Sequence, residues 1–77
     1  MTERNILLDS MEKVSKFGRI IEDCEIPIDL RSGRYVVNAH SMIGMFSLDL
    51  SSPVTLVLHA DQEEGAQILQ KLEEFFC

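Results

Sequence analysis

The spacing of the apolar residues changes near residue 24, from a period of three or four residues to a period of two. Before this point, apolar side chains recur at helical spacing, at Met11, Val14, Phe17, Ile21 and Cys24. This stripe predicts a helix over roughly residues 10–22. The alternation that follows, at Ile26, Ile28 and Leu30, predicts a half-buried strand. A chain with both patterns has to pack helices against a sheet, as α+β proteins do.

Two pairs of acidic residues have the spacing of a capping box at a helix N-terminus. Asp9 is followed by Glu12, and Asp61 is followed by Glu64, so each aspartate is predicted to cap a helix. Residues 4–9 before the first helix are predicted to form a short strand. The final helix is expected to bury an apolar stripe made of Ile68, Leu69, Leu72, Phe75 and Phe76.

The remaining segments have strand and turn patterns. Pro27 cannot donate a ladder hydrogen bond, so we expect the strand that contains it to lie at a sheet edge or to carry a bulge. Residues 31–34 are predicted to form a turn in which Gly33 takes a positive φ, and Tyr35 begins the returning strand. Residues 54–58 are apolar in part on both faces and are predicted to be a central strand. The whole chain, 1–77, is thus predicted to be one domain: an open-faced sandwich with helices on one face of a four-stranded, mostly antiparallel sheet.

Composition narrows the classes of function. Seven basic residues against thirteen acidic ones give a net charge of −6, which repels a phosphate backbone, so nucleic acid is not an expected partner. The sequence has no secretory or membrane-spanning segment, and a cytoplasmic location is the default expectation. Cys24 and Cys77 form no CxxC pair and are expected to be free thiols.

The segment His40–Leu48, with the sequence HSMIGMFSL, carries the most specific motif. It resembles the serine-containing segment of the HPr family, the small phosphocarriers of the bacterial sugar phosphotransferase system, which runs roughly Lys-Ser-Ile-Met-Gly-Leu-Met-Ser-Leu. The preceding Gly33–Ala39 segment is similar to the family's hairpin, and the predicted element order also matches. The resemblance therefore covers the whole chain and implies an HPr-like fold.

The resemblance assigns roles to the residues of this segment. Ser41 matches the serine that a dedicated ATP-dependent kinase phosphorylates in family members from Gram-positive bacteria. The apolar residues after it match the patch on which such proteins dock their partners; with the flanking His40, the expected docking residues are Met42, Ile43, Met45 and Phe46. From its position alone, Ser41 is also predicted to cap a short helix by accepting a hydrogen bond from the amide of Ile43 or Gly44. The expected partners are proteins, with a serine kinase or a transcription regulator as candidates.

The second hallmark of the family is missing. Typical carriers have Gly-x-His-x-Arg-Pro between the first strand and the first helix, and its histidine accepts the phosphoryl group. Here the chain runs from Leu8 and Asp9 to Ser10 and Met11, with no histidine. The resemblance therefore implies a regulatory or binding module, with no enzyme activity and no cofactor.

Two alternatives remain open at this stage. One is a working carrier that uses His40 or His59 as an unconventional acceptor. The other is a small thiol-dependent enzyme built on Cys24 or Cys77, although no base is apparent beside either thiol. A zinc site at the two histidines is not expected, because no third ligand lies at suitable spacing.

Overall fold

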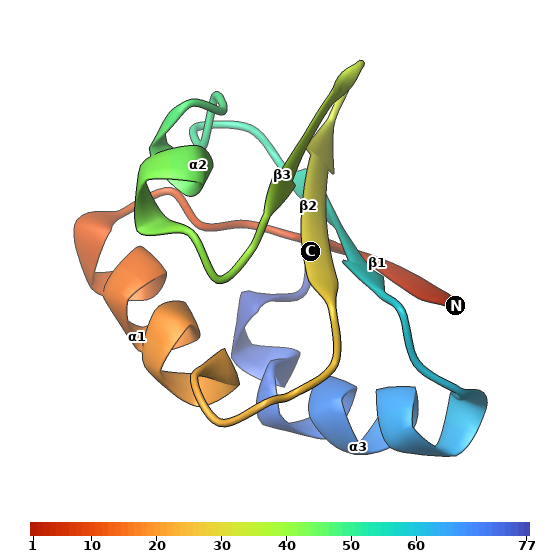
Figure 1. The fold of residues 1–77 in the computed structure, drawn as a ribbon. Helices are drawn as coiled ribbons and strands as arrows, with labels where there is room; N and C mark the ends of the chain where they lie inside the picture. Colours follow the sequence, from red (N-terminus) through yellow and green to blue (C-terminus); the bar gives the residue numbers. More distant parts are fainter.

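A computed structural model describes residues 1–77 and shows four antiparallel strands in the order β1-β4-β2-β3, with helices on one face (Figure 1). The elements are β1 (Thr2–Ile6), α1 (Met11–Ile21), β2 (Ile28–Ser32), β3 (Tyr35–Asn38), α2 (Met42–Phe46), β4 (Val54–Leu58), α3 (Gln62–Lys71) and a short 3-10 helix, η1 (Glu73–Phe75). The predicted fold class and element order are confirmed. No helix has the length and apolar character that crossing a membrane would require.

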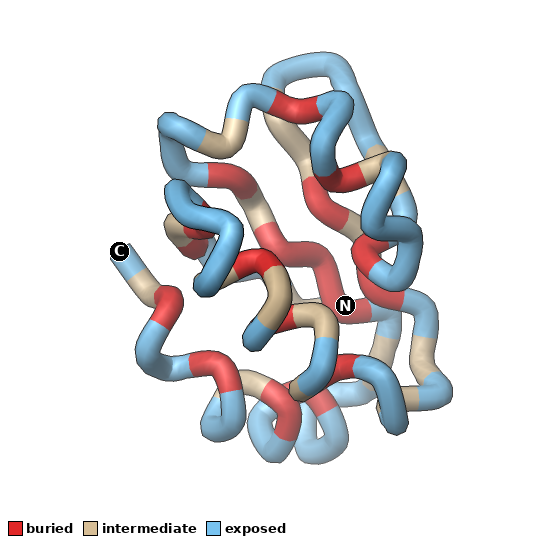
Figure 2. Tube along the Cα trace, turned by 90° about the vertical axis from the view of Figure 1, so that its left-hand side faces the viewer, coloured by how far each residue is buried: buried red, intermediate tan, exposed pale blue.

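The core lies between the sheet and the helices, where the buried residues gather (Figure 2). β4 is the central strand, as predicted, because it pairs with β1 on one side and β2 on the other. Leu56 and Leu58 of β4 are fully buried on the helix face. Val57, on the opposite face, is 6% exposed and lies between Glu3 and Asp29 of the neighbouring strands.

The predicted cap of α1 is wrong by one residue. The Ser10 Oγ accepts a hydrogen bond from the Lys13 amide at 3.1 Å, so Ser10 is the N-cap. The Asp9 carboxylate instead accepts a bond from the Lys13 Nζ at 2.9 Å. Met11, predicted to lie on the buried stripe, is exposed: it is the first residue of α1 and lines a hollow that is open to solvent. The other three helical members of the stripe, Val14, Phe17 and Ile21, are buried as predicted.

The strand that follows also differs from the prediction. β2 lies between β4 and β3, so the expectation of an edge strand is wrong. Pro27 precedes the first residue of β2, and its missing N–H therefore falls outside the ladder. The Pro27 carbonyl accepts a hydrogen bond from the His59 amide at 3.1 Å. The predicted turn is confirmed at Gly33, which has a φ of 59°, and at Arg34, whereas Arg31 and Ser32 belong to β2.

The C-terminal residues pack against α1 and the end of β1. Asp61 caps α3 by accepting a bond from the Glu64 amide at 2.8 Å, as predicted. Beyond α3, the Phe75 ring meets the Phe17 ring edge to face, with 5.9 Å between the centroids. The Phe75 carbonyl accepts a 2.8 Å bond from the Leu7 amide, and Phe76 forms a β-bridge with Ile6. The end of the chain thus holds β1 and α1 together.

Candidate functional site

Ser41 is the N-cap of α2, and the predicted capping role is confirmed. Its Oγ accepts a hydrogen bond from the Gly44 amide at 3.0 Å. The Ser41 amide donates to the Asn38 carbonyl at 3.0 Å, and the Met45 amide donates to the Ser41 carbonyl at 3.0 Å. Ser41 itself is exposed. Its hydroxyl is therefore held at the start of the helix and is open to solvent.

The apolar residues of α2 divide between the surface and the core. The exposed fractions are 87% for Ile43 and 46% for both Met42 and Phe46. Met45 is only 1% exposed, so it does not belong to the exposed part of the predicted docking patch. A helix of little more than one turn has one inward side, and here that side carries Met45, which joins the buried cluster around Ala39 and Leu48. The exposed patch therefore consists of Met42, Ile43 and Phe46.

His40 joins α2 to the end of α1. Its Nε2 lies 3.2 Å from the Ile21 carbonyl oxygen. Because a carbonyl oxygen can only accept, this contact places the ring proton on Nε2. The His40 amide donates to the Asn38 Oδ1 at 2.9 Å. The residue is exposed, but its ring is oriented by the backbone of another element.

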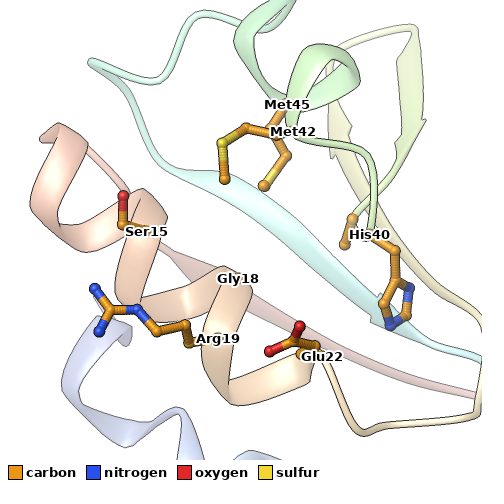
Figure 3. A pocket seen from close by; sticks show the side chains of 8 residues that line it. Ser15, Gly18, Arg19, Glu22, His40, Met42 and Met45 are labelled. Carbon is orange, nitrogen blue, oxygen red and sulfur yellow. The ribbon is translucent and has the colours of Figure 1, made fainter.

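A groove of about 460 Å³ runs between α1 and α2. Its α1 side carries Ser15, Gly18 and Glu22, and its α2 side carries Met42 and Met45, whose side chains reach toward α1 (Figure 3). The sequence analysis missed this groove. Its only signal was the small residues at positions 15 and 18 within an otherwise large-residue helix, which leave space beside α2.

A second, mostly apolar depression of about 260 Å³ lies where the connection between β1 and α1 passes the end of α2. Leu8, Val14 and Leu48 are buried at its base, and Met11 and Phe46 are exposed at its rim. The groove and this depression lie side by side, because neighbouring residues of both helices line them. We call the two together the α1–α2 surface.

Two carboxylates have lowered pKa values: Asp9, which lines the depression, and Asp49, which lies in sequence between its lining residues Leu48 and Leu50. Hydrogen bonds from the Ser51 hydroxyl and amide hold the pKa of Asp49 below its usual range. The Lys13 ammonium, hydrogen-bonded to Asp9, lowers the pKa of that carboxyl in the same way. A lowered pKa favours the ionised form in the folded state, and this contribution is lost only as the pH falls through the lowered value. Both groups are therefore anionic at neutral pH.

The segment between β1 and α1 contains Leu7, Leu8, Asp9 and Ser10, and neither histidine of the chain lies near it in sequence. The second histidine, His59, follows β4, and its Nε2 lies 2.8 Å from the Asp29 Oδ2 of β2. Cys24 is half-buried after α1, and Cys77 is exposed at the C-terminal residue. Cys24 and His40 line one shallow pocket, but no group of three or more histidine, cysteine, aspartate or glutamate side chains is placed to hold a metal ion.

Comparison with known proteins gives matches among solved structures. No family model and no curated protein matches this sequence. A crystal structure described as HPr-C-His from Thermoanaerobacter tengcongensis superimposes with a TM-score of 0.75 at 26% identity, covering 96% of this chain and 92% of that one. A phosphocarrier protein HPr from Bacillus anthracis strain Ames superimposes with a TM-score of 0.74 at 17% identity, covering 99% and 96% of the two chains. Over its whole length, this chain therefore has an HPr-like fold.

Proposed function

We propose that this protein is an HPr-like regulatory or binding module that works through Ser41 and the exposed face of α2, and that it does not carry phosphoryl groups on histidine. The observation that carries the proposal is the geometry of α2. A solvent-exposed serine caps this helix, and Met42, Ile43 and Phe46 beside it are exposed although they are large and apolar. Exposed apolar side chains in a cluster are typical of protein docking sites.

The segment between β1 and α1 supports the second half of the proposal. A phosphocarrier needs a neutral imidazole, which attacks phosphorus and later leaves. The four residues from Leu7 to Ser10 offer a carboxylate and a hydroxyl in its place. The hydroxyl of Ser10 is already used as a helix cap, and the carboxylate of Asp9 is paired with Lys13.

Phosphorylation of Ser41 would act on the docking face without unfolding the domain. A phosphate adds a charge of about −1.5 to −2 at pH 7. Ser41 stands at the start of α2 and next in sequence to the exposed Met42, so the new charge would alter the apolar face that a partner contacts. Phosphorylation would thus change the choice of partner.

Incubation with phosphoenolpyruvate and the first enzyme of the phosphotransferase system is expected to leave this protein unlabelled. The HPr from Bacillus anthracis serves as the positive control, since it has the same fold and is a phosphocarrier. Acid-labile labelling in stoichiometric amount would overturn the proposal. Mapping that label to His40 or His59 would establish the alternative of a carrier with an unconventional acceptor.

Treatment with ATP and the HPr serine kinase of a Gram-positive bacterium is expected to add one phosphate, at Ser41. Ser41→Ala should abolish the mass increase. Ser47→Ala is the matched control at the other end of α2, where the Ser47 hydroxyl donates a 2.6 Å bond to the Gly44 carbonyl, and it should leave the mass increase unchanged. Equal phosphorylation of the Ser41→Ala variant, measured by mass spectrometry, would remove Ser41 from the proposed mechanism.

A further inference from the structure

β3 forms one edge of the sheet, and the backbone groups on its outer side have no neighbouring strand (Figure 1). The Ala39 amide, just after β3, donates to the Ile28 carbonyl at 2.8 Å. Because residues of an antiparallel strand point alternately toward and away from the paired strand, Val37 also bonds toward β2. Val36 and Asn38 point the other way. The N–H and C=O of Val36 and the N–H of Asn38 are therefore open to a further strand.

The opposite edge of the sheet, β1, is covered by the C-terminal segment. The Asn5 carbonyl accepts a hydrogen bond from the Cys77 amide at 3.4 Å, and the Leu7 amide donates to the Phe75 carbonyl at 2.8 Å. Covering an edge in this way prevents pairing with another chain. Each molecule thus has one open edge, so strand pairing through it joins two molecules and goes no further.

The open edge lies in the part of the chain that has no acidic residue. Residues 30–48 contain none of the thirteen acidic residues and two of the seven basic ones, Arg31 and Arg34. The exposed fractions of Tyr35 and Val36 are 68% and 58%. The remainder of the molecule carries the excess negative charge and repels a second copy. At the β3 edge, two copies can approach without bringing carboxylates together.

We propose that β3 pairs antiparallel with β3 of a second copy, which joins the two sheets across a twofold axis. Val36 lies opposite Val36 of the second copy, and the two residues exchange both backbone hydrogen bonds. The same register places Tyr35 opposite Val37 of the second copy and Arg34 opposite Asn38. Pairs of an aromatic and a β-branched side chain stabilise neighbouring antiparallel strands. The occupant of the edge is therefore this chain itself.

One pair of opposite charges also fits this register. Asn38 is paired with Asp29 of β2, so Arg34 of the second copy lies two strands from Asp29. Their Cα atoms are then about 10 Å apart, which the long arginine side chain can span toward the carboxylate. Strands of four residues bury less than the roughly 1,200 Å² of a stable interface. The expected dimer is therefore weak and reversible.

Sedimentation velocity of the whole protein tests the self-pairing. We expect mainly monomer at about 0.02 mM and a measurable dimer fraction at about 1 mM, as suits a small interface. Amide chemical shifts of the isotope-labelled protein should change most at Val36 and Asn38 over this range, because their N–H groups donate to the second copy. A monomer at the higher concentration, or shift changes confined to α2, would overturn the proposal.

Val36→Lys should weaken the dimer. It places two ammonium groups opposite each other at the twofold axis, so the dissociation constant should rise at least about tenfold. Ile43→Lys is the matched control, since it makes the same change of charge at another exposed apolar residue, outside β3. This control should leave the dissociation constant unchanged. Equal weakening by both variants would mean that the copies meet elsewhere, and the docking role of α2 would be unaffected by a failure of Val36→Lys alone.

Cross-linking tests the register in a chain whose Cys24 and Cys77 are replaced by serine. Val36→Cys should form a disulfide between two copies in oxidised glutathione, because opposite Cα atoms in a hydrogen-bonded pair are about 5.5 Å apart. In Arg34→Cys the two new thiols belong to residues about 13 Å apart along the strands, so this variant should stay a monomer. Electrophoresis without reductant measures both. Cross-linking of Arg34→Cys as fast as that of Val36→Cys would contradict the proposed pairing.

Discussion

Phe75→Ala should lower the free energy of unfolding by about 3–5 kcal/mol, as removal of a buried aromatic ring does. A chain of this length is stabilised by only about 4–12 kcal/mol in total. The variant should therefore lose a large fraction of its free energy of unfolding. The ring is 2% exposed and packs edge to face on Phe17, which is fully buried in the middle of α1. Its loss would leave a cavity where the C-terminal segment, α1 and β1 meet. Urea unfolding followed by circular dichroism measures the change.

Phe76→Ala is the matched control. The Phe76 ring is half-buried, and the Arg4 guanidinium carbon lies 4.2 Å from its centroid. An exposed cation–π contact of this kind contributes about 0.5–1 kcal/mol. The backbone bridge between Phe76 and Ile6 does not depend on the side chain. Destabilisation by Phe76→Ala as large as that by Phe75→Ala would contradict the assignment of Phe75 to the core.

The sequence alone predicted the order of the elements because both periodicities are strong in this chain. The predicted boundaries were less accurate where two neighbouring residues have similar chemistry. Asp9 and Ser10 can both cap a helix, and the sequence spacing favoured Asp9. The cap is Ser10 because its hydroxyl meets the amide three residues ahead, while the longer side chain of Lys13 reaches Asp9. Such a competition is decided by geometry and not by spacing.

The position of β2 shows a different limit. The presence of Pro27 shows that one backbone N–H is missing, but it does not show at which residue the hydrogen-bonded ladder of β2 begins. The pairing of Ile28 with Leu58 of β4 starts the ladder one residue later. A proline immediately outside a strand is compatible with a place inside the sheet. The edge position predicted from it was therefore wrong, although the strand itself was predicted correctly.

The candidate site was predicted in part. The capping role of Ser41 follows from local chemistry, so the sequence could show it. The groove beside Gly18 could not be predicted, because it depends on how α2 lies against α1. The residues that border it, including Glu22 and Ala39, come from separate parts of the chain. These residues form one groove with Met42 only in the folded protein, so the sequence alone does not show that they lie together.

Met45→Ala and Ile43→Ala are expected to have different effects on stability, although only Gly44 separates the two residues on a five-residue helix. Met45 is 1% exposed within the buried cluster, so its truncation should lower the free energy of unfolding by about 2–5 kcal/mol. Ile43 is 87% exposed, and its truncation should change stability by no more than about 0.5 kcal/mol. Urea unfolding of both variants measures these differences.

Binding of a protein partner should show the reverse pattern, with a larger effect of Ile43→Ala than of Met45→Ala. Ile43→Ala removes an exposed apolar side chain from the proposed docking face, so it should weaken binding of a protein partner severalfold while the protein stays folded. Met45→Ala, measured where the variant is still folded, should weaken binding much less, because the Met45 side chain is only 1% exposed. Loss of binding in both variants with equal loss of stability would mean that α2 acts as one structural unit. A separation of the two effects would show that one turn of helix serves the core with Met45 and the partner with Ile43.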